Sequence, residues 1–291
     1  MNNPVLAIDG GGTKCKATLY DHTGALLAEA VSGPANLFLD FELAKQSIMN
    51  AANACLLQTN SQRSDTISIA DVILSAGCAG ANIKTAATQF NQWKSEFYQK
   101  FVTTDLHISC LAANHNKDCG LVIVGTGSAV ARFKNNKVTQ FGGHGFELGD
   151  KASGAWMGKS AIKTALECLD CLHDDDEFVS MVMRTTKCHD GQEIISKYAK
   201  ESAATFASLA PEVFRLANSG NKLAHRIVAQ GANYICSILR NNDFASLPDC
   251  YIVGGIADAL LPYLQSQLGF SIQLADTQAE YGAFLYAQTQ P

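Results

Sequence analysis

The stretch that most constrains the fold is residues 5–14, an apolar run that ends in aspartate, three glycines, threonine and lysine. An apolar run of this length bounded by glycines is typical of a buried β-strand. Glycines let backbone N–H groups approach a phosphate closely, and an adjacent aspartate can hold Mg²⁺ through water. The stretch therefore predicts a strand followed by a nucleotide phosphate loop. The residues expected at the phosphates are Gly11, Gly12, Thr13 and Lys14, with Asp9 at the metal.

Two commoner glycine-rich phosphate loops do not fit this stretch. The dinucleotide-binding fingerprint opens a helix, but residues 14–20 are partly alternating and β-prone, and a turn at 22–24 precedes another apolar run at 25–31. The Walker A pattern needs Gly before the lysine and Ser or Thr after it, and Lys14 has neither. A phosphate loop at the tip of a hairpin remains, beside the alternative of a plain glycine-rich turn.

The same order of elements occurs a second time. Residues 121–128 are again an apolar run that ends in glycine and hydroxyl residues, followed by a strand at 129–134, a turn at 135–137 and a strand at 138–141. Each copy is too large for one unit of a solenoid, so the repeat predicts two homologous α/β domains, residues 1–118 and 119–291. If the two loops face each other, a nucleotide would lie in the cleft between the domains. Its phosphates would then contact Thr126, Gly127 and Ser128 as well as the first loop.

The remaining elements alternate between helix and strand. In the first half we expect helices at 41–58, 85–97 and 108–114 and strands at 71–77 and 101–104. In the second half we expect helices at 155–172, 176–184, 191–209, 211–218, 221–240 and 279–288 and strands at 250–253 and 272–274. The strand at 250–253 runs into a glycine turn at Gly254 and Gly255.

Phosphoryl transfer requires positioning, charge neutralisation and a base for the attacking hydroxyl. The base should be a carboxylate at the end of a strand. Asp105, directly after the strand at 101–104, is the best candidate, and Asp150 is the second. Either residue could instead be a solvated or helix-capping aspartate.

Composition excludes several classes of partner. The chain has 291 residues, of which 47% are hydrophobic and 17% charged, as in globular proteins with a substantial core. A net charge of −5 without a basic cluster argues against nucleic acid. No signal segment and no membrane-spanning run is recognised, which predicts a cytoplasmic protein without a membrane partner. The ten cysteines are then expected to be reduced thiols.

Taken in order, the motifs resemble the N-acetylglucosamine/glucosamine kinase branch of the BadF/BadG/BcrA/BcrD ATPase family, within the actin-like ATPase and sugar kinase superfamily. Asp105 resembles the catalytic aspartate that precedes the second phosphate motif. The segments that carry the rest of the resemblance are residues 9–14, 32–36, 125–128, 142–150, 253–256 and 280–283. Each is weak alone, whereas their order and spacing together are specific.

The resemblance implies an α/β fold of two ribonuclease H-like (actin-like ATPase) domains with an interdomain cleft. The first domain would hold the sugar and the second the nucleotide, with the last helix packed on the first domain. The implied activity is Mg-ATP-dependent phosphorylation of the 6-hydroxyl of N-acetylglucosamine or glucosamine, with Asp105 as base. The implied sugar contacts are Asn36, Gly143, His144 and Asp150, and the implied adenosine contacts are Gly254 and Gly255. A homodimer is also favoured.

Two alternatives stay open beside a kinase. One is an ATPase that activates a partner enzyme, as in the iron–sulfur branch of the family, although no comparable cysteine pair follows a glycine turn here. The other is a sugar-sensing relative with weak catalysis. The substrate is open as well, because His144 stands where the vertebrate-like N-acetylglucosamine kinases carry an aromatic residue and bacterial glucosamine kinases do not.

Three further motifs are interpreted as structural. Residues 153–160 nearly match Walker A, but Ser153 replaces the first glycine and no apolar strand immediately precedes it. The cysteines and histidines between 168 and 189 lack the spacing of a zinc site. The acidic run at 174–177 is typical of a helix start.

Overall fold

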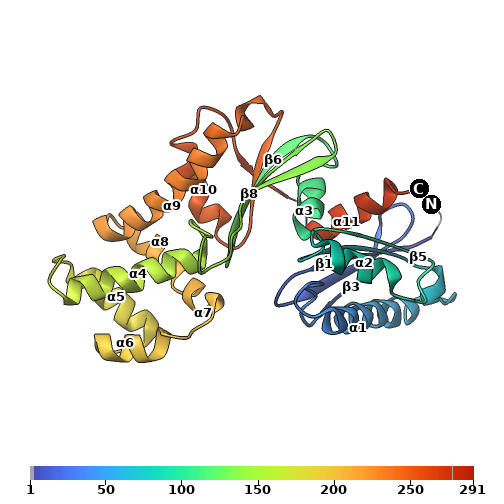
Figure 1. The fold of residues 1–291 in the computed structure, drawn as a ribbon, viewed down its shortest axis with the longest axis horizontal. Coiled ribbons are helices and arrows are strands. Elements are labelled where there is room, and N and C mark those ends of the chain that lie inside the picture. Colours follow the sequence, from blue (N-terminus) through green and yellow to red (C-terminus); the bar gives the residue numbers. More distant parts are fainter. Residues whose placement is uncertain (1–2, 277) are drawn as a thin grey trace. The chain divides into compact units, whose positions relative to one another are not determined.

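The computed structural model describes residues 3–276 and 278–291. Its internal contacts divide the chain into two compact units. Unit 1 comprises Met1–Asp118, Phe133–Val138 and Asp276–Pro291, and unit 2 comprises Cys119–Arg132 and Thr139–Ala275. Each unit is built on one five-stranded sheet with helices packed against it (Figure 1). The predicted α/β fold class is confirmed.

The sheet of unit 1 has the strand order β3-β2-β1-β4-β5. Strand β2 is antiparallel to both β1 and β3, whereas β1, β4 and β5 are parallel. Strands β1, β3, β4 and β5 therefore all end at the same edge of the sheet. The elements of this unit are β1 (Val5–Gly10), β2 (Cys15–Tyr20), β3 (Leu26–Ser32), α1 (Phe41–Asn60), the 3₁₀ turn η1 (Ile69–Asp71), β4 (Ile73–Cys78), α2 (Lys84–Gln92), β5 (Gln99–Thr103), α3 (Asp105–Ala113) and α11 (Ala279–Gln288).

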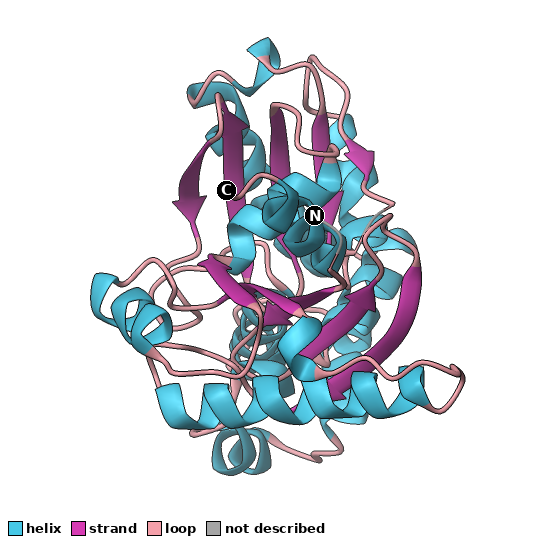
Figure 2. Cartoon of the chain, turned by 90° about the vertical axis from the view of Figure 1, so that its right-hand side faces the viewer, coloured by secondary structure: helices cyan, strands magenta, loops and turns pink. Residues whose placement is uncertain are grey.

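Strand β1 is buried on both faces because helices cover both sides of the sheet. Leu6 and Ile8 point into the core that contains α1, and Val5 and Ala7 point into the core that contains α11. The alternation follows from the two-residue period of a strand. Figure 1 shows α1 and α11 on opposite faces of this sheet, and Figure 2 shows the same strands between their helices from the side. The central strand is thus fixed on both faces, and the loop that follows it starts from a rigid base.

Unit 2 repeats this topology. Its strand order, β10-β9-β6-β7-β8, has the first strand in the centre, the second and third to one side and the fourth and fifth to the other, as in unit 1. The elements are β6 (Cys119–Val124), β7 (Ser128–Lys134), β8 (Lys137–Gly142), α4 (Gly154–Leu169), α5 (Asp176–Thr186), α6 (Gly191–Tyr198), α7 (Ala203–Ala207), α8 (Ala210–Asn218), α9 (Lys222–Asn241), the 3₁₀ turn η2 (Phe244–Ser246), β9 (Cys250–Val253), α10 (Ala257–Gln265) and β10 (Gln273–Leu274).

Three predicted helix boundaries were wrong. The single helix expected at 191–209 is two helices, α6 and α7, because Ser202 caps a new helix start by accepting from the Thr205 amide. The helix expected at 85–97 ends at Gln92, and the one expected at 108–114 already begins at Asp105. Helix α10, which contains Pro262, was not predicted at all. Among the described residues, no helix is long and apolar enough to cross a membrane.

Candidate active site

Four connections of unit 1 meet at the edge where β1, β3, β4 and β5 end. Backbone hydrogen bonds join three of them. The Ala35 amide donates to the Gly11 carbonyl at 2.9 Å, the Ala79 amide donates to the Gly10 carbonyl at 2.8 Å, and the Leu37 amide donates to the Ala79 carbonyl at 3.0 Å. The carboxyl ends of parallel strands are where open α/β sheets bind ligands. The edge therefore collects the first glycine loop, the turn at 33–36 and the start of α3.

The first glycine loop, residues 11–14, is open to solvent. It is closed by one hydrogen bond from the Gly11 amide to the Lys14 carbonyl at 2.9 Å, and Gly12, Thr13 and Lys14 are exposed. A Cβ built on Gly12 would meet no atom within 4 Å. Gly10, just before the loop, differs, because a Cβ there would lie 2.6 Å from the Cys78 sulfur. The loop backbone is thus accessible to a ligand, while the strand beneath it is closely packed.

Two carboxylates lie at the base of this edge. Burial raises the pKa of Asp9 to about 6, with further increases from the charges of Glu280 and Asp105 and decreases from Lys14 and Lys16. Burial also raises the pKa of Asp105 above its ordinary value. Both groups are therefore carboxylates whose charge lacks full compensation from the protein, as expected of groups that act on a cation or a proton.

Asp105 is held at the first turn of α3. Thr104 caps this helix by accepting from the His107 amide at 3.0 Å, and the Asp105 carboxylate accepts from the Leu106 amide at 2.9 Å. The N-terminus of a helix favours a negative charge. The helix start therefore keeps Asp105 oriented, while burial keeps it basic.

Sequence reasoning missed an ion pair next to Asp9. Lys16 is the residue opposite Asp9 across β1 and β2, and its Nζ lies 3.1 Å from Oε1 of Glu280, whose residue is 2% exposed. Lys16 also donates to the Gln278 side chain. The local sequence indicates this pair only through Glu280, a charged residue in the otherwise apolar sequence of α11. The partner of Glu280 cannot be predicted locally, because the contact forms only when α11 packs against the first sheet.

Asn36 occupies the turn after β3. Its Oδ1 accepts from the amides of Phe38 and Leu39, both at 3.0 Å. A Cβ on Gly80, whose φ is +79°, would lie 2.7 Å from the same oxygen. The oxygen of the amide group is thus occupied by the backbone, so Nδ2 is the atom that Asn36 can offer to a hydroxyl.

In unit 2, the second glycine loop, residues 125–128, is joined to the start of α4. The amides of Gly154 and Ala155 donate to the carbonyls of Gly125 and Thr126 at 2.8 and 3.3 Å. These two first-turn donors of α4 are therefore satisfied by the loop rather than open to a ligand. Residues 153–160 belong to this helix, so their near match to Walker A has a structural basis.

Asp150 connects the second glycine loop to the glycine-rich segment at 142–150. Its Oδ1 accepts from the Gly145 amide at 3.0 Å, and a Cβ on Gly127 would lie 2.7 Å from Oδ2. Burial raises the pKa of Asp150, while hydrogen bonds from the amides of Gly145 and Ser128 act to lower it. The carboxylate is thus already engaged with the backbone, and it positions both segments.

The turn at Gly254 and Gly255 follows β9, the neighbour of β6. Gly254 has a φ of +115°, and a Cβ there would lie 2.1 Å from the Val124 carbonyl, so the position requires glycine. Gly255 lies beside the second loop, with its nitrogen 3.9 Å from where a Cβ on Gly125 would be. The two glycine turns thus lie together at the ends of adjacent strands.

The predicted site residues therefore fall into two groups. Unit 1 gathers Asp9, residues 11–14, Asn36 and Asp105 at one sheet edge. Unit 2 brings residues 126–128 together with Asp150, and Gly255 lies beside the same loop. Gly143 and His144 are exposed on the segment that Asp150 ties down.

The remaining motifs have structural roles where contacts are seen. Asp175, in the acidic run, caps α5 by accepting from the Phe178 amide at 2.9 Å and also accepts from the Asn221 side chain. Nine of the ten cysteines are buried, and the exception is Cys171. Among the described residues, no three His, Cys, Asp or Glu side chains are grouped so that they could hold a metal ion.

Comparison with known proteins defines the class. The fold matches a solved structure from Chromobacterium violaceum, described as that of a candidate N-acetylglucosamine kinase, with a TM-score of 0.84 at 23% identity over 97% of this chain and 98% of that one. The two-unit α/β fold is thus that of the actin-like ATPase and sugar kinase group. The family model of the BadF/BadG/BcrA/BcrD ATPase family matches residues 6–287, so the chain belongs to this family, as the motifs predicted.

Two curated relatives carry kinase names. The glucosamine kinase GspK of Vibrio cholerae is 28% identical over 285 residues, which is 98% of this chain and 96% of the relative. The N-acetyl-D-glucosamine kinase of Dictyostelium discoideum is 23% identical over 250 residues, which is 81% of this chain and 78% of the relative. Both relatives are thus named as kinases of an amino sugar.

Proposed function

We propose that this protein is an ATP-dependent kinase that transfers the γ-phosphate to the 6-hydroxyl of N-acetylglucosamine or glucosamine. The observation that carries the proposal is Asp105. It is a largely buried carboxylate with a raised pKa, fixed at the start of α3, on the sheet edge that also carries the first glycine loop and Asn36. Family membership and the names of the two relatives support the same activity.

In this proposal Asp105 accepts the proton of the sugar hydroxyl as that oxygen attacks the phosphorus. A raised pKa makes a carboxylate a stronger base for that proton. Asn36 would donate from Nδ2 to a sugar hydroxyl, since its oxygen is occupied. Gly143, His144 and Asp150 would contact the sugar from the segment at 142–150, and orientation of the acceptor supplies much of the rate enhancement.

The residues present fit a magnesium nucleotide. The exposed backbone of residues 11–14 and the hydroxyls of Thr13 and Thr126 can donate to phosphate oxygens, and Gly254 and Gly255 would face the adenosine. The hydroxyl of Ser128 already donates to the Lys151 carbonyl, so Ser128 would meet a phosphate through its backbone. Asp9, with its pKa raised to about 6, gains a compensating charge if a cation lies near it. Mg²⁺ is commonly held by one or two carboxylates, water and substrate phosphates, and it neutralises phosphate charge.

The substrate panel tests the proposal. ADP release would be measured with glucosamine, N-acetylglucosamine, glucose and N-acetylmannosamine, and the phosphorylated carbon of each product would be assigned by NMR. We expect turnover with one or both of the first two sugars and phosphate on C6. A folded protein inactive on all four sugars would contradict the proposal, and phosphate on another carbon would contradict the predicted regiochemistry.

A matched pair of variants links the activity to the site. Asp105→Asn should abolish most turnover, whereas Asp170→Asn, at the exposed end of α4, should leave it unchanged. ATP hydrolysis that persists without any sugar dependence would instead favour an ATPase that activates a partner enzyme. Tight sugar binding with negligible turnover would favour a sugar-sensing relative.

A further inference from the structure

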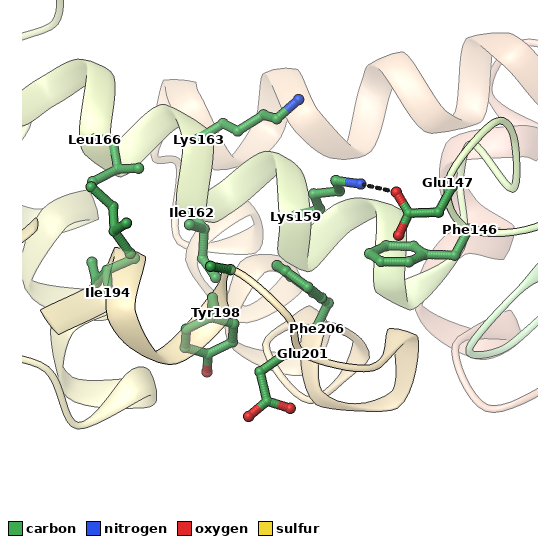
Figure 3. Close-up of a pocket in the computed structure, with 12 residues that line it drawn as sticks. Phe146, Glu147, Lys159, Ile162, Lys163, Leu166, Ile194, Tyr198, Glu201 and Phe206 are labelled. Atoms are coloured by element: carbon green, nitrogen blue, oxygen red, sulfur yellow. Dashed lines mark hydrogen bonds and ion pairs between the residues drawn. The ribbon is translucent and has the colours of Figure 1, made fainter. Parts of the chain in front are cut away.

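A pocket of about 310 Å³ lies in unit 2 between α4, α6, α7 and the segment at 142–150 (Figure 3). Phe146 and Glu147 of that segment form one wall, and Lys159 and Ile162 of α4 form another. Two aromatic residues, Tyr198 of α6 and Phe206 of α7, also line the pocket. The wall formed by the segment is of interest because the same segment carries Gly143, His144 and Asp150.

One side chain of α4 holds two consecutive residues of this segment. The Lys159 ammonium lies 3.2 Å from Oε2 of Glu147 and 4.4 Å from the centre of the Phe146 ring. Figure 3 shows Lys159 reaching across to Glu147 next to the Phe146 ring. An ion pair and a cation–π contact made by one ammonium group fix both the direction of the segment and its distance from the helix.

The Phe146 ring is supported by aromatic neighbours. It packs against Phe206 with ring centres 5.2 Å apart, and Phe206 packs against Tyr198 at 5.3 Å. This arrangement depends on Gly158, because a Cβ there would lie 1.9 Å from the Phe206 carbonyl. Glycine at 158 therefore lets α7 approach α4, and Lys159 follows directly. Gly158 and Lys159 resemble the Gly-Lys pair of a Walker A motif, but here they pack α4 against α7 and the segment at 142–150.

Besides the contacts of Lys159, the segment between Gly142 and Gly149 is restrained by its Gly145 amide, which donates to Oδ1 of Asp150 at 3.0 Å. Gly142, Gly143 and Gly145 have φ values of +67°, +68° and +83°, and glycine loses more conformational freedom on ordering than any other residue. Within the segment, the Gly149 amide donates to the Gly145 carbonyl at 2.7 Å. Anchoring Phe146 and Glu147 from outside would lower the entropy lost when the segment orders around a ligand.

We propose that Lys159 is a positioning residue for sugar binding, which acts by holding the segment at 142–150 through Glu147 and Phe146. The inference rests on the proposed kinase function. Lys159→Met should raise KM for the sugar about 3- to 10-fold, a range set by the modest strength of a partly exposed ion pair and a cation–π contact. The kcat at saturating sugar and the KM for ATP should change less than twofold.

The chain offers a matched control one turn further along α4. Lys163 lines the same pocket and is drawn in Figure 3 without an interaction among the residues shown. Lys163→Met removes the same charge from the same helix and should leave the sugar KM unchanged. Lys159→Arg, which keeps the charge, should restore most of the affinity. Glu147→Gln removes the ion pair by neutralising its more exposed partner. It should raise the KM for the sugar by less than Lys159→Met does.

A second measurement does not depend on turnover. Hydrogen–deuterium exchange of the peptide that spans residues 142–150 should be faster in Lys159→Met than in wild type and unchanged in Lys163→Met. If wild type is active and Lys159→Met matches Lys163→Met in sugar KM and in exchange, the inference is wrong. If kcat and stability fall while the KM for ATP rises, Lys159 supports the unit as a whole, which also overturns the inference. A wild type inactive on every sugar would instead count against the kinase proposal, while exchange would still test the anchoring.

Discussion

The two glycine loops occupy the same place in two copies of one sheet topology, but they are held in different ways. The loop of unit 1 is surrounded by charge, with Asp9 before it, Lys14 within it, and the Lys16–Glu280 pair beside it. The loop of unit 2 is held by the backbone, since its carbonyls accept from α4 and Asp150 accepts from Gly145. Charged side chains are thus concentrated around the loop of unit 1, whereas hydrogen bonds fix the loop of unit 2.

This difference suits the two loops to different roles. A loop open to solvent and next to uncompensated carboxylates is suited to groups whose charge changes during a reaction. A loop whose carbonyls are fixed by a helix is suited to positioning. Changes in unit 1 should therefore affect rate and pH dependence, and changes in unit 2 should first affect stability.

The largest effect is expected at Asp105, the proposed base. Asp105→Asn should lower kcat by a factor of about 10² to 10⁴ with little change in either KM, because a general base contributes on this scale. Since burial raises the pKa of Asp105, kcat/KM of the wild type should fall as the pH is lowered toward that pKa, where protonation removes the base. Initial rates between pH 5 and 8 would check this. An unchanged kcat in Asp105→Asn would show that Asp105 is not the general base.

A pair of glycine substitutions tests the contrast in rigidity. Gly254→Ala, at a φ of +115° with the Val124 carbonyl 2.1 Å from the new Cβ, should lower the free energy of unfolding by about 2 kcal/mol or more. Gly12→Ala, where no atom lies within 4 Å, should change it by less than about 0.5 kcal/mol. Urea unfolding of both variants provides the measurement. Equal losses would show that the turn after β9, which lies beside the second loop, is packed no more tightly than the first loop.

Ionised Asp9 should lower the free energy of unfolding at neutral pH. Its folded-state pKa of about 6 exceeds the ordinary 3.8, so the ionised group destabilises the fold at neutral pH. Asp9→Asn should therefore stabilise the protein by about 1–3 kcal/mol at pH 7 while lowering ATP-dependent turnover. The gain should shrink as the pH falls through 6 toward 4, because the folded wild type then takes up the proton. A variant that is less stable than wild type at pH 7 would contradict the charged description of this loop.

The elements that were predicted well have strong local patterns. The glycine loops followed from buried strands that end in glycine, and the helix at 279–288 was placed with its observed bounds. The repeat of strand order could be predicted because the turn residues recur. The break between α6 and α7 was missed because the apolar pattern runs through it while the cap at Ser202 is a single polar residue.

Contacts between distant segments could not be predicted from local patterns. Nothing near Lys16 indicates that Glu280 is its partner, since the pair forms only when α11 packs on the first sheet. The same holds for Lys159, whose contacts with Phe146 and Glu147 depend on the path of the glycine-rich segment. The sequence therefore predicted the strands and glycine turns around the candidate site better than the long-range contacts that hold them.

The smallest expected effect comes from removing one hydroxyl group from each loop. Ser128 is 6% exposed, and its Oγ donates to the Lys151 carbonyl at 2.9 Å, so Ser128→Ala should lower the free energy of unfolding by about 1 kcal/mol. Thr13, the exposed hydroxyl of the first loop, has no such bond among the described residues, and Thr13→Ala should leave stability within about 0.5 kcal/mol of wild type. Thermal unfolding at pH 7.5 with and without Mg-ATP would measure both. Because Ser128 is tied to Lys151, its loss should lower stability before ligand is added, whereas the loss of Thr13 should be visible only as a smaller stabilisation by Mg-ATP. The reverse pattern would mean that the first loop is the rigid one.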